Sequence, residues 1–374
     1  MAQVSLNTRV SLTQAAKAIA VIGAQRTVIL EGEPGIGKSS TLKALASLYP
    51  SYHTVYLDCQ LLSDQGDFFY PFIVVTEAGS HTAKRIALED FDFSDGVPVI
   101  MMLDEIGKST KPVMNVITTL MQERRIGNNH LPEGSIVYAT TNLASDGVGD
   151  FIAAHASNRV IRLEVQKPHV GMNTDGSVDK DSWGMWALSN DIDPTLLAWF
   201  KMNPQALDSY RDHDSKTEWS NPYAYHPTKG AKSFVSNRSA HTASDIIKKR
   251  DELNDHELTM AMLAGACGES FARDFSAYLV VKDRLPTPDA IRNAPETALV
   301  PEKGDAIAQV QLALMLVNQV NTDSVDAFVT YVKRLGSEYQ ALFGKSAIAN
   351  PLKQAIVIKC EAFRKWALDN QWMF

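Results

Sequence analysis

Short apolar runs alternate with helical or polar stretches through the first half of the chain. Each run has about four to seven residues and is rich in valine and isoleucine, and five of them cover residues 26–30, 54–57, 97–103, 135–139 and 160–163. Nearly continuous apolarity in so short a run favours strands of a parallel sheet that is covered on both faces. Their alternation with helices predicts an α/β domain over residues 1–165, a three-layer αβα sandwich around a parallel five-stranded sheet.

Helical signals flank these runs. Ser11-Leu12-Thr13-Gln14 has the pattern of a capping box, so a helix should begin there and end near Gly23. Residues 39–48 carry a helical pattern of leucines and alanines directly after a glycine-rich segment. The first helix and this second one should therefore cover the predicted sheet.

The pattern changes after residue 165. Polar, glycine- or proline-containing loops are expected at 171–180 and 214–226, and helical periodicity follows in four long segments, 254–281, 305–320, 324–335 and 351–372. We expect a linker loop over residues 166–184 and an all-helical lid and C-terminal helical region over residues 185–374.

Composition limits the functional classes. With 45% hydrophobic and 21% charged residues the chain is typical of soluble globular proteins. A formal net charge of −7 argues against a general nucleic-acid-binding surface. Three widely spaced cysteines argue against a disulfide framework or a zinc site and favour a reducing compartment. Neither a signal peptide nor a continuous apolar span of membrane length is evident, so we expect a cytoplasmic protein.

The glycine-rich segment has a specific chemistry. Gly32-Glu33-Pro34-Gly35-Ile36-Gly37-Lys38-Ser39 matches the phosphate-binding pattern GxxxxGK[ST] between a predicted strand and a predicted helix. Glycines let backbone amides approach phosphates, Lys38 would reach the β- and γ-phosphates, and Ser39 would bind magnesium. The whole segment, with Ser40 after it, is the predicted ATP-binding loop.

Two carboxylates end the third predicted strand. In VPVIMMLDE, a buried strand delivers Asp104 and Glu105 at its carboxyl end, where open α/β sheets bind ligands. Asp104 would hold Mg²⁺ and Glu105 would polarise the attacking water. A polar amide, Asn142, follows the next strand and could orient that water, although asparagine after a strand is also an ordinary turn residue.

In order, the segments GEPGIGKS, VIMMLDE, VYATTN, SNRV and FVSNRS resemble an AAA+ ATPase of the MoxR group, of the kind common in bacteria and their phages. The resemblance covers nearly the whole chain and is tightest over residues 28–163. It implies that Asn142 is sensor 1, that Arg159 is an arginine finger acting on a neighbouring subunit, and that Arg238 is sensor 2 in the lid. Arg162 is the alternative finger.

The same resemblance implies partners. A homo-oligomeric ring, most often a hexamer, is expected, and MoxR relatives often work with a von Willebrand factor A domain protein. The leading interpretation is a chaperone-like remodeller or activator of a protein. A nucleic-acid-associated ATPase, such as a helicase loader or a phage replication or packaging factor, is the alternative, and a slowly hydrolysing nucleotide-gated switch is a third.

Some residues keep two interpretations. The aromatic segment Asp67-Phe68-Phe69-Tyr70-Pro71-Phe72 either forms a pore loop that grips a polypeptide or packs against the domain body. Three basic residues either line a subunit interface or pore or are solvated surface charges: Lys108, Arg124 and Arg125.

Overall fold

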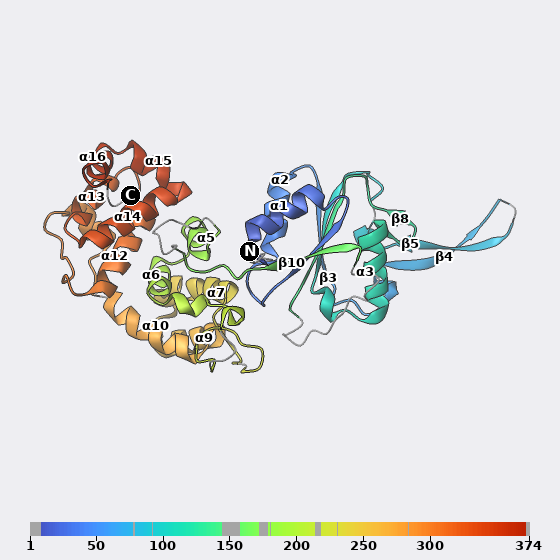
Figure 1. The fold of residues 1–374 in the computed structure, drawn as a ribbon, viewed down its shortest axis with the longest axis horizontal. Helices are drawn as coiled ribbons and strands as arrows, with labels where there is room; N and C mark the ends of the chain where they lie inside the picture. The colour runs from blue at the N-terminus through green and yellow to red at the C-terminus, as the bar shows by residue number, and fades with distance from the viewer. Residues whose placement is uncertain are drawn as a thin grey trace, which may run out of the picture. The chain divides into compact units, whose positions relative to one another are not determined.

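The computed structural model describes residues 9–77, 79–91, 93–143, 158–171, 179, 181–213, 218–229, 231–282 and 284–371 of the chain. The chain divides into two compact units, Met1–Lys167 and Pro168–Phe374. In Figure 1 the first unit runs from blue to green and the second from green to red. The first unit therefore ends at Lys167, two residues beyond the end that the sequence predicted. Among the described residues no helix is long and apolar enough to cross a membrane.

A six-stranded sheet with parallel pairing is the centre of the first unit. Its spatial order is β1-β10-β2-β9-β6-β3, and the strands span Arg9–Val10 (β1), Thr27–Glu31 (β2), His53–Asp58 (β3), Val99–Asp104 (β6), Ile136–Thr141 (β9) and Val160–Val165 (β10). The five predicted strands are confirmed. The predicted strand number is wrong by one, because β1 has only two residues and shows no apolar run.

Helices cover both faces of this sheet, as predicted. On one face α1 (Leu12–Ile22) and α2 (Ser40–Leu48) pack on alternate strand residues such as Leu30, Met102 and Tyr138. On the other face α3 (Lys111–Glu123) packs on the residues between them, including Met101 and Val137. All six residues of β6 and of β9 are buried. The continuous apolarity of these strands follows from this two-sided burial.

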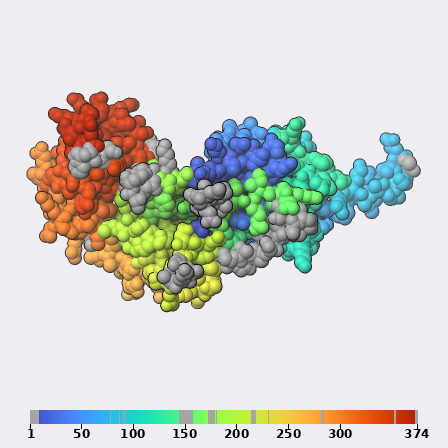
Figure 2. All heavy atoms as spheres, viewed as in Figure 1, coloured from blue at the N-terminus to red at the C-terminus, as the bar shows by residue number. Residues whose placement is uncertain are grey.

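Two antiparallel hairpins were not predicted. The larger pairs β4 (Phe69–Val75) with β5 (His81–Ala87), and it extends away from the rest of its unit in the ribbon and in the space-filling view (Figures 1 and 2). The smaller pairs β7 (Arg125–Ile126) with β8 (Asn129–His130). A Cβ at Gly127 of its turn would meet the Arg85 and Phe69 side chains at 3.4 Å, so the small hairpin lies against the base of the large one.

The second unit is helical, as predicted. Its helices are α5 (Trp183–Ser189), α6 (Pro194–Met202), α7 (Asn237–Lys248), α8 (Arg250–Leu253), α9 (His256–Cys267), α10 (Glu269–Lys282), α11 (Pro288–Asn293), α12 (Ala306–Gln319), α13 (Val325–Val332), α14 (Ser337–Ala349), α15 (Pro351–Lys359) and α16 (Glu361–Asp369). Aromatic residues dominate its core, where Trp199 contacts Phe200, Phe271 and Phe275.

Two of the predicted long helices are wrong as single helices. Residues 254–281 form α9 and α10, because Gly268 between them has φ 95°, which an α-helix cannot accommodate. Residues 351–372 form α15 and α16, because Cys360 is extended and its sulfur accepts the backbone N–H of Phe363 as an N-cap. The sequence also missed α14. Of the predicted loops, residues 172–178, 180 and 214–217 lie outside the described residues.

Candidate nucleotide-binding site

The glycine-rich loop joins β2 to α2. Gly35 and Gly37 have φ of 74° and 101°, a left-handed conformation that glycine adopts without a Cβ clash. Ile36 between them is buried and anchors the loop in the core under α1 and α2. Ser40 opens α2, and its hydroxyl donates to the Gly37 carbonyl at 2.7 Å. These features place the loop and the amino terminus of α2 together, the arrangement that binds phosphates through backbone amides.

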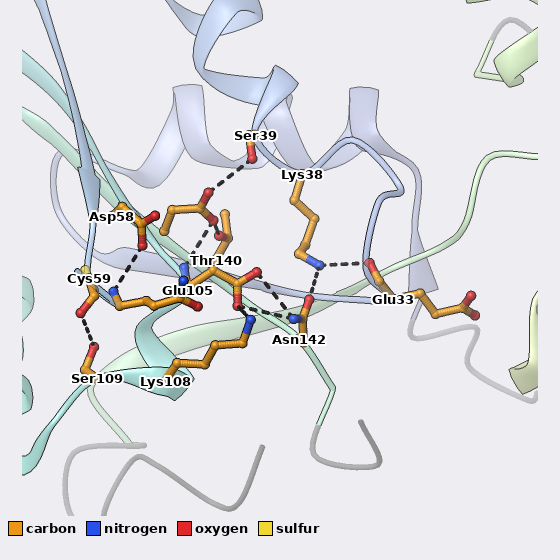
Figure 3. Close-up of polar contacts among 12 residues, drawn as sticks. Glu33, Lys38, Ser39, Asp58, Cys59, Glu105, Lys108, Ser109, Thr140 and Asn142 are labelled. Atoms are coloured by element: carbon orange, nitrogen blue, oxygen red, sulfur yellow. Dashed lines mark hydrogen bonds and ion pairs between the residues drawn. The ribbon is translucent and has the colours of Figure 1, made fainter. Parts of the chain in front are cut away.

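Lys38 is buried under this loop. Its ammonium donates to the carbonyl of Gly32 at 2.7 Å. It also donates to the carbonyl of Glu33 at 2.9 Å and to Asn142 Oδ1 at 3.0 Å (Figure 3). Since Asn142 follows β9, the lysine connects the loop to the neighbouring strand of the sheet. All three of these acceptors are neutral oxygens.

Asp104, the last residue of β6, is the hydrogen-bond centre of the site. Its Oδ2 accepts from Ser39 Oγ at 3.2 Å and from the Tyr56 hydroxyl at 2.8 Å. Its Oδ1 accepts from Thr140 Oγ1 and from the backbone N–H of Glu105, the latter at 3.1 Å. The Ser39–Asp104 contact places the loop and the carboxylate at the same edge of the sheet, as the sequence predicted.

Glu105 leaves β6 in an unusual backbone conformation. It has φ 53° and ψ 37°, a left-handed conformation that is uncommon for a residue with a side chain. Asn142 Nδ2 donates to both Glu105 carboxylate oxygens at 3.2 and 3.3 Å, and Lys108 Nζ lies 3.1 Å from Oε2 (Figure 3). The strained turn thus aims the carboxylate at the side chain that also contacts Lys38.

Glu33 has a different environment from the other loop residues. It is 3% exposed, and its carboxylate lies 3.9 Å from the ammonium of Lys167, which is 7% exposed. Buried opposite charges offset part of each other's desolvation cost. This pair therefore connects the glycine-rich loop to the last residue of the first unit.

The predicted arginines lie elsewhere. Arg159 is exposed, directly precedes β10 and donates to Gln122 Oε1 at 2.5 Å. Val160 pairs with Thr27, so this end of β10 lies beside the amino end of β2, about 15 Å along the strand direction from the glycine-rich loop at ~3.3 Å per residue. Arg162 pairs with Glu31 at 2.6 Å. The residues 155–157 that precede Asn158-Arg159 in the predicted finger motif lie outside the described residues.

Arg238 belongs to the second unit. It is exposed at the second position of α7, whose amino terminus carries a capping box between Ser236 and Ser239. Asn237 before it is buried and donates to the Pro168 carbonyl at 3.2 Å. The first turn of α7 is thus fastened to the first residue of its unit, with the Arg238 side chain in solvent.

The three basic residues with open interpretations have separate roles. Arg124 is half-buried and donates to Thr27 Oγ1 and to the carbonyls of Met121 and Gly23, so it is structural. Burial lowers its pKa to about 10. Arg125 pairs with Glu123 at 2.7 Å. Lys108 is the one of the three that touches a site residue.

The aromatic segment also divides. Phe68 and Phe69 are buried and belong to the core under α3, whereas Tyr70 and Phe72 on β4 are 60% and 57% exposed. The packing interpretation is therefore confirmed for Phe68 and Phe69, and the pore-loop interpretation of Tyr70 and Phe72 stays a prediction.

Sequence reasoning missed Tyr56 and Thr140. Thr140 lies in the segment TTN that was singled out for Asn142 alone, and Tyr56 lies near the carboxyl end of a predicted strand. The position of both near strand ends at the ligand edge was the available signal. Nearby, burial and the charges of Asp104 and Asp58 raise the pKa of the Cys59 thiol.

The donor set suits a magnesium-bound triphosphate. Ser39 and Asp104 offer hard oxygen ligands, the kind that Mg²⁺ prefers, beside a loop of backbone amides. Lys38 supplies a positive charge. Glu105 supplies a second carboxylate, which accepts hydrogen bonds from Asn142. The geometry therefore separates the acid that contacts Ser39 from a second acid, Glu105, which Asn142 and Lys108 contact at the same edge of the sheet.

One family model matches part of the chain. Residues 27–163 match the family model of the AAA domain, dynein-related subfamily. No curated protein matches the chain.

Solved structures share only low similarity. A putative ATPase from Cytophaga hutchinsonii is 18% identical over 49% of this chain, with a TM-score of 0.31, and the match spans about half (52%) of that ATPase. A mutant of RuvB from Thermotoga maritima is 12% identical over 76% of this chain and 73% of its own, with a TM-score of 0.35. NtrX from Brucella abortus in complex with ADP is 11% identical over 97% of this chain and 67% of its own, with a TM-score of 0.34.

Proposed function

We propose that this chain, whose residues 27–163 match the AAA-domain family model, is an ATP hydrolase that works as a ring-forming motor of MoxR type and remodels or activates a protein partner. The observation that carries the catalytic part is the convergence of Lys38, Ser39, Asp104, Glu105 and Asn142 at one sheet edge. The order of motifs along the chain, which resembles the MoxR group, supports the finer assignment.

The roles follow from this geometry. Lys38 and the loop amides bind the triphosphate, and they orient it towards Glu105. Glu105 takes a proton from the attacking water, and Asn142, which contacts both Lys38 and Glu105, holds water and phosphate in register. Ser39 and Asp104 are the residues that would hold a magnesium ion. That ion, when bound, neutralises charge that develops on the phosphates.

Two arginines complete the proposal. Arg159 lies at the far end of the sheet from its own glycine-rich loop, so it acts on the nucleotide of a neighbouring copy. An arginine at that position presents a planar, permanently charged fork to a γ-phosphate. Arg238 is the sensor in the helical unit, exposed on a helix whose first turn is rigidly capped. Turnover then depends on assembly of a ring, for which a hexamer is proposed.

The partner is proposed to be a protein. The β4–β5 hairpin exposes a run of large apolar side chains, which suits contact with a polypeptide better than contact with a phosphate backbone: Tyr70, Phe72, Ile73 and Val75 are between 57% and 65% exposed. A von Willebrand factor A domain protein is the partner class that the MoxR resemblance implies.

Glu105→Gln tests the catalytic proposal. The amide keeps the shape of the side chain but cannot accept a proton, so turnover should fall about 10²- to 10⁴-fold, while ATP binding is retained. Steady-state phosphate release, binding of a fluorescent ATP analogue and sedimentation of the assembly would be measured together.

Glu133→Gln is the matched control, because Glu133 is an exposed carboxylate of the same unit. It should hydrolyse ATP at the parental rate. Parental turnover in Glu105→Gln would show that the role assigned to Glu105 is wrong.

A further inference from the structure

Tyr56 reaches into the site from the edge strand of the sheet. Its hydroxyl donates to Asp104 Oδ2 at 2.8 Å, which is closer than the 3.2 Å contact of Ser39 with the same oxygen. Tyr56 is 52% exposed, yet its hydroxyl donates to Asp104, a residue that is 8% exposed. A hydroxyl at such an exposed position could be satisfied by water, so its direction towards Asp104 needs a separate reason.

The strand register creates this contact. In the parallel pair of β3 and β6, Tyr56 lies opposite Met102, and Asp58 lies opposite Asp104. Residues two apart on a strand project from the same face, so Tyr56 and Asp104 share the face that α2 covers. Because β3 is at the edge of the sheet, the ring can lie on the surface while its tip reaches inward.

The Asp104 carboxylate is fastened at both oxygens. Thr140 and the Glu105 backbone N–H hold Oδ1, and Ser39 and Tyr56 hold Oδ2. The terminal torsion of an aspartate is broad and roughly two-fold, so donors to one oxygen alone leave its orientation poorly defined. If Ser39 turns to a metal, the Tyr56 hydroxyl still donates to Oδ2.

We propose that Tyr56 is a positioning residue for the magnesium site: its hydroxyl holds Asp104 Oδ2 towards Ser39. This inference rests on the proposed role of Asp104 as a magnesium ligand. Hydrogen-bond partners that orient a metal ligand typically contribute about 10- to 100-fold to metal affinity. Tyr56 would act through Asp104, the group that its hydroxyl contacts.

Tyr56→Phe tests the inference, because it removes the hydroxyl and leaves the exposed ring. Binding of a fluorescent ADP analogue would be titrated with MgCl₂, and in parallel measured in EDTA. The magnesium concentration for half-maximal effect should rise about tenfold or more, with ADP affinity in EDTA unchanged. At saturating magnesium the turnover number should approach the parental value, so the effect is on the metal requirement and not on kcat.

Tyr49→Phe is the matched control. It removes a tyrosine hydroxyl of the same unit that donates to the Ala20 carbonyl at 2.9 Å. This variant should melt at a lower temperature than the parent and show the parental magnesium titration. An equal shift in the two variants would overturn the inference, because the effect would then be general destabilisation.

Asp104→Asn separates the inference from the proposed function. Loss of the magnesium effect in Asp104→Asn, together with a parental titration in Tyr56→Phe, would overturn the role of Tyr56 and leave that of Asp104 intact. A parental magnesium titration in Asp104→Asn would instead contradict the role of Asp104 as a magnesium ligand, and with it the role of Tyr56.

Discussion

The ligand edge of the central sheet and the β4–β5 hairpin belong to the same unit, but they differ in how many of their side chains have partners within the chain. At the sheet edge, Lys38, Asp104 and Glu105 all have hydrogen-bonding partners from neighbouring strands and loops. On the hairpin, Phe72 and Ile73 are 57% and 65% exposed. An isolated two-stranded hairpin is marginally stable in water, so such a surface gains stability from contact with another molecule.

This difference separates the residues proposed for ATP hydrolysis from the surfaces proposed for assembly and partner binding. The groups proposed to bind and activate a triphosphate are held by contacts within the chain, and preorganised donors contribute most to catalysis. The exposed groups, Arg159 at the opposite sheet end and the apolar hairpin, have no role in that local network. In the proposed ring they are the parts of the first unit that would acquire a role through assembly or a partner.

The largest expected effect tests whether the residues at the sheet edge of one chain are sufficient for ATP hydrolysis. Arg159→Ala should lower turnover about 10³- to 10⁵-fold if the arginine completes the site of a neighbouring copy. Mixing it with Lys38→Ala subunits, which keep the arginine, should restore part of the activity. Phosphate release over a range of mixing ratios measures this.

Arg162→Ala is the control, since Arg162 lies on the same strand and pairs with Glu31. It should hydrolyse ATP within about twofold of the parent, as exposed ion pairs contribute little. A large loss of turnover in Arg162→Ala and none in Arg159→Ala would assign the arginine finger to Arg162. If the mixture with Lys38→Ala subunits recovers no turnover, action between copies is contradicted.

The ligand edge was largely predictable from sequence. The glycine-rich loop, Asp104, Glu105 and Asn142 follow apolar strands, and the carboxyl ends of parallel strands meet at one edge. Tyr56 and Thr140 were not predicted, because a tyrosine or threonine within a strand is first explained by strand propensity. Their contribution depends on the register between β3, β6 and β9, which one sequence does not reveal.

The hairpin was not predictable for a related reason. Residues 69–75 are nearly all apolar, which indicates a buried strand, yet most of β4 is exposed. Its partner β5 contains His81, Lys84 and Arg85 and lacks an apolar pattern. In the second unit, periodicity found the helices but not their breaks, because Gly268 and Cys360 act through backbone conformation and capping and not through hydrophobicity.

A second prediction tests the hairpin as the surface that requires another molecule. Phe72→Asp combined with Ile73→Asp should weaken binding of reduced, carboxymethylated α-lactalbumin, a permanently unfolded protein, about tenfold or more, because burial of such side chains contributes roughly 1.5–3 kcal/mol each. ATP hydrolysis without this protein should stay at the parental rate. Fluorescence anisotropy and phosphate release measure the two quantities.

Leu61→Asp is the matched control for that variant, since Leu61 is 74% exposed in the same unit but outside the hairpin. It should bind the unfolded protein like the parent. Equal weakening in both variants would contradict a specific hairpin surface. Binding of a single-stranded oligonucleotide that depends on Phe72 and Ile73 and weakens with salt would favour the nucleic-acid alternative.

The smallest expected effect lies where the ligand edge meets solvent. Lys108 is exposed on one side, and its ammonium lies 3.1 Å from the Glu105 carboxylate, which Asn142 also holds through two contacts. Because an exposed ion pair contributes about 0.2–1 kcal/mol, Lys108→Met should lower kcat by roughly fivefold at most. Asn142→Ala should lower kcat by much more, since it removes the group that joins Glu105 to Lys38.

Measurement of both variants from 50 to 500 mM NaCl sharpens the contrast. The difference in kcat between Lys108→Met and the parent should shrink as salt screens the ion pair, whereas the Asn142→Ala defect should persist. A salt-independent loss in Lys108→Met as large as that of Asn142→Ala would mean that Lys108 belongs to the preorganised network and not to its solvent boundary.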